Sequence, residues 1–204
     1  VNTSGDPAFV FNPACWISDA VAIRSSGTIA TGNRFETLAR MAISASGDDQ
    51  QIKNNFVSGA GEAGLYLLAA RNPQACSNVI TDIVMTDIVA SGIEANFCIG
   101  AVINDNLIKR PECNGIRLAG MASGETRGNI IVDCGQTIGK VYPNGPEAAA
   151  SGKVGLALEA EKRAGIFVSS YEEWPCESLD VDGNEVVDKR QGASMLTLSF
   201  TQPS

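Results

Sequence analysis

Histidine is absent from this 204-residue chain, and positive charge is scarce, because 15 Lys and Arg residues stand against 23 Asp and Glu residues for a net charge of −8. The lack of histidine excludes catalytic triads and metal centres that depend on an imidazole. No CxxC motif occurs either, which disfavours a zinc site. Few basic residues are present to neutralise phosphates, so nucleic acid is disfavoured as a partner. We therefore expect no metal, no cofactor and no nucleic acid.

Long apolar runs are also missing. No stretch of 18 apolar residues occurs, so the sequence predicts no membrane span. The chain starts without an initiator Met or a signal peptide. This start favours a processed or truncated product of a longer protein.

Apolar residues at helical spacing are lacking as well, and the chain has a repeat of short strands instead. Asn106-Leu107-Ile108 returns 23 residues later as Asn129-Ile130-Ile131, and Gly183 to Asp188 is a close copy of Gly128 to Asp133. Asn-like residues fall at positions 33, 55, 82, 106 and 129, at spacings of 22, 27, 24 and 23 residues. A repeat of this period indicates a solenoid.

The repeat has a physical interpretation. Strands of three to six residues are too short to be stable alone. A chain that winds would pair each turn with the next at about 4.8 Å. The sequence thus predicts a parallel β-helix, with an apolar core and Asn ladders at the bends. We expect Gly64, Gly92 and Gly115 to supply a backbone conformation that other residues reach only with strain.

The pattern resembles the right-handed parallel β-helix superfamily, which includes pectate lyases, polygalacturonases, alginate epimerases and phage tailspikes. The resemblance covers residues 15–142 and 164–200. It implies an all-β, right-handed, single-stranded parallel β-helix of about six to eight turns. We expect turns with N-terminal opening strands over residues 1–142, a loop excursion over 143–163, and the last turns and a terminal strand over 164–204.

Six cysteines are spread along the chain, at positions 15, 76, 98, 113, 134 and 176. The spacing of successive turns is compatible with disulfides and also with free thiols that pack as small core residues. We favour buried free thiols, because a solenoid gains its stability from stacking. A catalytic thiol usually needs a basic partner, and the chain has no histidine.

Carboxylates remain the candidate catalytic groups. Two of them on adjacent turns would supply the acid and base, or the acid and nucleophile, of a glycosidase. Asp82 and Asp105 lie at nearly matching phases of the repeat, and Glu94 lies a strand later. We therefore name Asp82, Glu94 and Asp105 as candidate catalytic residues, against the simpler interpretation that each is a solvated surface residue.

Basic and aromatic side chains are candidates for substrate binding. Arg110 and Arg117 have the charge to bind acidic sugars, and Tyr171 and Trp174, in the stretch YEEW, have rings on which sugars stack. The alternatives are that Arg110 belongs to an ordinary turn and that residues 171–174 form a loop packed on the last turn.

Two functions remain open from the sequence. The first, which the resemblance implies, is a polysaccharide-binding β-helix of the tailspike or depolymerase kind that cleaves glycosidic bonds as a hydrolase or lyase. The second is a non-catalytic structural or adhesive segment of a larger protein. A homotrimer fits either function. For both we expect an extracellular, cell-surface or virion-associated location.

Overall fold

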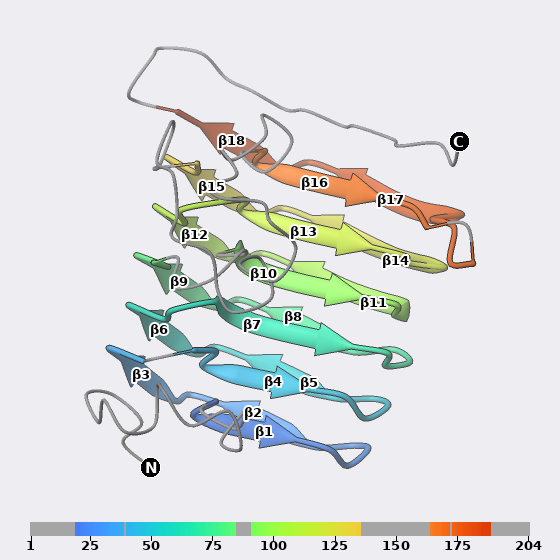
Figure 1. Ribbon diagram of the computed structural model, residues 1–204, viewed down its shortest axis with the longest axis horizontal. Coiled ribbons are helices and arrows are strands. Elements are labelled where there is room, and N and C mark those ends of the chain that lie inside the picture. The colour runs from blue at the N-terminus through green and yellow to red at the C-terminus, as the bar shows by residue number, and fades with distance from the viewer. Residues whose placement is uncertain (1–18, 39, 85–90, 136–163, 172, 189–204) are drawn as a thin grey trace, which may run out of the picture.

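The computed structural model describes residues 19–38, 40–84, 91–135, 164–171 and 173–188. These residues form 18 β-strands and no helix, arranged in three parallel sheets of six strands each. Successive strands of the chain enter the three sheets in rotation, so that each turn gives one strand to each sheet (Figure 1). The predicted parallel β-helix is confirmed, and the described part contains six turns.

The strands are short, as the repeat predicts. Sheet A contains, in spatial order, β1 (Val21–Ile23), β4 (Ile43–Ala45), β7 (Ala63–Leu68), β10 (Ser91–Asn96), β13 (Ile116–Ala119) and β16 (Ile166–Ser169). Sheet B contains β2 (Ile29–Thr31), β5 (Gln51–Lys53), β8 (Gln74–Cys76), β11 (Ile99–Asn104), β14 (Ser123–Arg127) and β17 (Ser178–Asp182). Sheet C contains β3 (Arg34–Glu36), β6 (Phe56–Ser58), β9 (Val79–Thr81), β12 (Leu107–Lys109), β15 (Ile130–Val132) and β18 (Glu185–Val187).

The core lies between the three sheets and is built from columns of aliphatic side chains. In sheet C the paired residues Val57, Ile80, Ile108, Ile131 and Val186 form one such column, and all five are buried. Full burial of one such side chain contributes about 1.5–3 kcal/mol. Stability is therefore distributed along the solenoid, because each turn packs on its neighbours.

An Asn ladder joins the turns at the corner between sheets B and C. Each Asn side-chain oxygen accepts hydrogen bonds from the backbone N–H and the Nδ2 of the Asn in the preceding turn, at 2.8–3.0 Å. The predicted ladder is confirmed, with one correction. Its third member is Asn78, and not Asp82, which was predicted at this position. The members are Asn33, Asn55, Asn78, Asn106, Asn129 and Asn184.

Glycine is needed at the start of three strands of sheet A, within β7 and β10 and just before β13, for space rather than for backbone conformation. Gly64, Gly92 and Gly115 do not have positive φ angles, so the predicted reason was wrong. A Cβ atom on Gly92 would lie 2.5 Å from Ile108 Cγ2 and 2.7 Å from the carbonyl oxygen of Gly115. The backbones of successive turns thus approach too closely here for any side chain.

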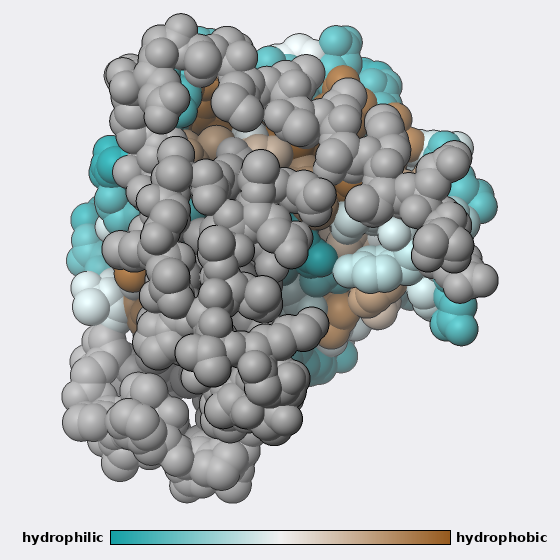
Figure 2. Space-filling model, turned by 45° about the horizontal axis from the view of Figure 1, so that its top comes forward, coloured by the Kyte–Doolittle hydropathy of each residue, from teal (hydrophilic) through white to brown (hydrophobic). Residues whose placement is uncertain are grey.

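The outer surface mixes polar and apolar residues. In the view of Figure 2, hydrophilic residues predominate along the visible edges of the described part, with hydrophobic residues between them. Sheet C carries the clearest apolar outer column, which comprises Phe56, Val79, Leu107 and Ile130. Ile130 is 41% exposed.

The prediction of buried free thiols is confirmed for Cys98, whereas Cys76 and Cys176 are only half-buried. Burial raises the pKa of Cys98 to about 11. Cys113 and Cys134 are also buried. Position 15, the loop excursion at 143–163 and the terminal strand lie outside the described residues, and so do the opening strands before residue 19.

Candidate functional site

The corner between sheets A and B carries one equivalent residue per turn: Ala69, Phe97 and Gly120. Each has a left-handed backbone, with φ values of 48°, 57° and 60°. Their N–H groups donate to Asn96, Ala119 and Ser169 of the following turn at 2.8–2.9 Å. In three successive turns this position is thus occupied by a small residue, an aromatic residue and a glycine.

The sixth turn widens at the same corner. Between β16 and β17 the chain makes a tight turn in which Tyr171 and Trp174 form an antiparallel bridge. Each of the two donates its N–H to the carbonyl of the other, at 3.1 and 3.0 Å. At the base of this turn the Cys176 N–H donates to the Ser170 hydroxyl at 3.1 Å. The bridge holds both aromatic side chains on the outside of the solenoid.

Phe97 reaches across the intervening turn to meet these rings. Its centroid lies 5.5 Å from that of Tyr171, with 38° between the planes, and 5.6 Å from that of Trp174, with 64° between them. Gly120 makes this possible, since a Cβ there would lie 2.7 Å from Phe97 Cδ1 and 3.1 Å from Trp174 Cβ. The three rings thus form one cluster that spans three turns.

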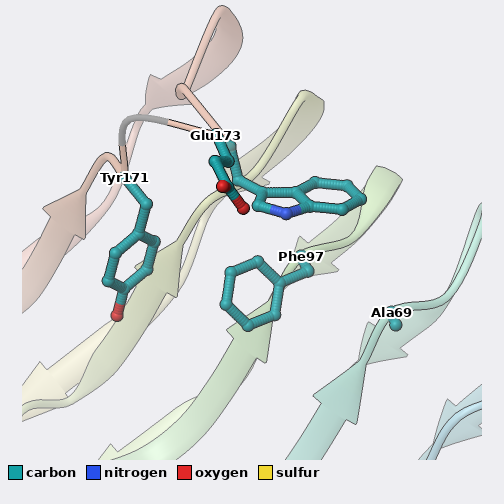
Figure 3. Close-up of a pocket in the computed structure, with 5 residues that line it drawn as sticks. Ala69, Phe97, Tyr171 and Glu173 are labelled. Atoms are coloured by element: carbon teal, nitrogen blue, oxygen red, sulfur yellow. The ribbon is translucent and has the colours of Figure 1, made fainter.

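An open depression of about 550 Å³ adjoins the cluster, and we refer to it as the aromatic pocket. It is lined by Ala69, Phe97, Tyr171, Glu173 and Trp174 (Figure 3). Tyr171 is 43% exposed and Trp174 is 46% exposed. Aromatic surface of this extent on the outside of a protein often marks a binding site.

A polar network beside the pocket holds Tyr171 in place. Arg117 donates from Nη2 to the Tyr171 hydroxyl at 3.1 Å and from Nη1 to Asn96 Oδ1 at 2.9 Å. Asn96 in turn donates from Nδ2 to the Tyr66 hydroxyl at 3.2 Å, and burial raises the pKa of Tyr66. The network extends from β7 to the turn after β16.

Glu94 lies on β10, between Tyr66 and Arg117 on the outer face of sheet A. It is 4% exposed, and its Oε2 lies 3.7 Å from Arg117 Nη1. Among the described residues, its Oε1 has no hydrogen-bond partner. Burial raises the pKa of Glu94, against the opposing effect of the Arg117 charge. Glu94 is therefore the one predicted catalytic carboxylate that adjoins the pocket network.

Asp82 and Asp105 lie on different corners, so their predicted match in phase was wrong. Asp82 follows β9, where Arg110 binds it through two hydrogen bonds of 2.6 and 2.8 Å. These bonds hold the pKa of Asp82 below its ordinary value. Asp105 precedes Asn106 at the corner between sheets B and C, and its backbone N–H donates to the backbone carbonyl oxygen of Arg127 at 3.0 Å. Strand β12 lies between the two corners.

The structure thus brings four of the seven predicted site residues together: Glu94, Arg117, Tyr171 and Trp174. It places Asp82 and Arg110 in a separate ion pair and Asp105 in a turn. Phe97 and the Tyr66–Asn96 hydrogen bond were not predicted from the sequence. The signal for Phe97 was its phase, because it occupies the position of Ala69 and Gly120 in neighbouring turns.

Clusters of metal ligands and membrane-spanning helices are both absent from the described part of the chain. Its residues include no group of three or more Cys, Asp or Glu side chains placed to hold a metal ion. They also include no helix that is long and apolar enough to cross a membrane.

Comparison with known families agrees with this architecture. The family model described as the right-handed β-helix region matches residues 12–193, which is most of the chain. The protein therefore belongs to the right-handed β-helix family. No curated protein and no solved structure matches the chain.

Proposed function

We propose that this protein binds an extended polysaccharide through the aromatic pocket. One observation carries the proposal: Phe97, Tyr171 and Trp174 come from two separate turns and share one open pocket, with two of the rings more than 40% exposed. Aromatic rings present a flat apolar face to the C–H face of a sugar ring, and the Tyr hydroxyl and the indole N–H bond its hydroxyl groups. An elongated solenoid also offers a surface on which a polymer can lie.

Cleavage of the bound glycan is a further part of this proposal. A glycosidase needs two carboxyl groups, about 5–9.5 Å apart, one of them protonated. Glu94 supports the acid role because burial raises its pKa and because Arg117 links it to Tyr171. Glu173, which is exposed and lines the pocket, is the candidate for the second carboxyl group.

The proposal is tested by measuring retention of the purified protein on a panel of immobilised bacterial surface polysaccharides. We expect retention on at least one of them, and at least about tenfold weaker binding after Trp174→Ala. Ile130→Ala is the matched control, because Ile130 is similarly exposed but lies on sheet C. Equal losses from both variants, or no retention on any glycan, would refute the proposal.

A reducing-end assay with the retained glycan then tests cleavage. Under the proposal new reducing ends appear with the wild type and fall by at least about a hundredfold in Glu94→Gln. Asp82→Asn and Asp105→Asn are the comparison variants. An equal fall in either of them would restore it as a catalytic candidate.

The alternative function, a structural or adhesive segment, is favoured by a different observation. The outer column of sheet C, which comprises Phe56, Val79, Leu107 and Ile130, is an apolar strip on the outside of the solenoid. Such a strip suits packing against other copies, as in a trimer. Light scattering of wild type and Leu107→Asp tests it: a wild-type oligomer that dissociates in the variant would support this function.

A further inference from the structure

The charge around the aromatic pocket determines which glycans fit it. Its lining has one charged side chain, Glu173. Figure 3 shows the carboxylate of Glu173 directed toward the space between the rings of Tyr171 and Phe97. Among the described residues no ion pair includes Glu173. A negative charge is thus presented to the pocket without a cation from the described part of the chain.

The aromatic rings, like this carboxylate, favour a cation in the pocket. The face of an aromatic ring carries partial negative charge and attracts a cation within about 6 Å of the centroid. Phe97 and its two partners are inclined by 38° and 64°, so they present faces in different directions. Rings at such angles, together with a carboxylate, form a suitable environment for an ammonium group.

Arg117 lies beside the pocket but is not one of its lining residues, and its donors are used within the chain. Arg117 is engaged by Asn96, by the Tyr171 hydroxyl and by the Glu94 carboxylate, and its side chain is only 20% exposed. We therefore infer that Arg117 positions Tyr171, and its predicted contact with substrate stays a prediction. An acidic sugar at the pocket would meet Glu173 and a chain with a net charge of −8.

From these observations we propose that the aromatic pocket selects a glycan unit that carries a positively charged amino group. This inference rests on the proposed function and specifies its substrate class. The sugar ring packs on Trp174 and Tyr171, and the ammonium group lies between the aromatic faces and the Glu173 carboxylate. Neutral sugars keep the stacking but lose the charge interaction, and acidic sugars are repelled.

The test compares glucosamine oligomers with N-acetylglucosamine oligomers of equal length, by calorimetry in mildly acidic buffer where the free amine is protonated. We expect the glucosamine oligomer to bind at least about fivefold more tightly. Glu173→Gln should reduce this preference to about twofold or less. Trp174→Ala should weaken both ligands.

The outcomes separate this inference from the proposed function. Equal or tighter binding of the N-acetylated oligomer would overturn the inference and leave glycan binding intact. A preference that survives Glu173→Gln unchanged would also overturn it. If no oligomer or polysaccharide binds, the proposed function fails, and tetramethylammonium alone is then titrated. Binding of that ion that is lost in Glu173→Gln would support a cation site, and no binding would overturn it.

Discussion

The Tyr171 hydroxyl accepts a hydrogen bond from Arg117 Nη2 at 3.1 Å, between residues 54 positions apart in the chain. This bond fixes an exposed ring of the sixth turn to the face of sheet A. It also connects the pocket to the buried Glu94, which lies 3.7 Å from the same guanidinium group.

Tyr171→Phe removes this bond and keeps the ring. We expect glycan binding to weaken by about two- to fivefold, because a ring that is no longer held must be ordered on binding. Calorimetric titration of the retained polysaccharide measures the effect. Tyr171→Ala should bind the glycan more weakly still. If Tyr171→Phe binds as tightly as the wild type, the hydrogen bond from Arg117 does not prepare the pocket.

Gly120→Ala places a Cβ atom 2.7 Å from Phe97 Cδ1 and displaces that ring from the cluster. Binding should weaken by about five- to tenfold, which corresponds to the loss of one aromatic contact. Gly32→Ala is the control, since Gly32 has a similar φ of +69° with nothing within 4 Å of the added atom. If both variants lose affinity equally, backbone strain rather than the position of Phe97 governs binding.

Asn106→Ala interrupts the Asn ladder at its most buried part. Asn106 accepts from the N–H and Nδ2 of Asn78 and donates to Ala75 and Asn129. The loss should lower the free energy of unfolding by about 3 kcal/mol, because buried donors remain unpaired. Chemical denaturation gives this value. Asn33→Ala, at the exposed end of the ladder, should cost less than about 1 kcal/mol, and equal costs would contradict a cooperative ladder.

The Asn ladder also shows how far the sequence predicts the fold. Period and strand length were sufficient for the β-helix, since stacked turns repeat their core residues. Predictions from residue type alone were wrong at two points, the ladder position of Asp82 and the reason for Gly92. Asp82 precedes an apolar pair, Ile83-Val84, that imitates the repeat, whereas only Asn78 has the amide that can both donate and accept. Gly92 is required by the close approach of Gly115 and Ile108, which only the register reveals.

The candidate site was predictable only in part, for a physical reason. Tyr171 and Trp174 stand three residues apart in a polar stretch, so the sequence points to them. Phe97 joins them only because two turns stack with Gly120 between them. The prediction that Asp82 and Asp105 occupy matching positions was wrong because the turn from Asn78 to Asn106 is 28 residues long. A residue 23 positions after Asp82 therefore falls at a different corner.

Glu94→Gln should change the pH dependence of stability. Burial raises the pKa of Glu94 in the folded state above its value in the unfolded chain. Below the unfolded pKa the carboxyl is neutral in both states and its contribution to stability is complete. That contribution is lost as the pH rises through the folded pKa.

Thermal unfolding of the wild type and Glu94→Gln over mildly acidic to neutral pH measures this effect. The unfolding temperature of the wild type should fall relative to the variant as the pH rises. A constant difference across this range would mean that Glu94 stays in one protonation state.

The most direct test of the account uses the fluorescence of Trp174. The chain has two tryptophans, so Trp16→Phe leaves Trp174 as the only indole. Titration with a retained polysaccharide should shift its emission to shorter wavelength in a saturable manner, because the ligand removes the exposed ring from water, and Phe97→Ala should weaken that response. An unchanged emission at saturating glycan would contradict the claim that the aromatic pocket is the binding site.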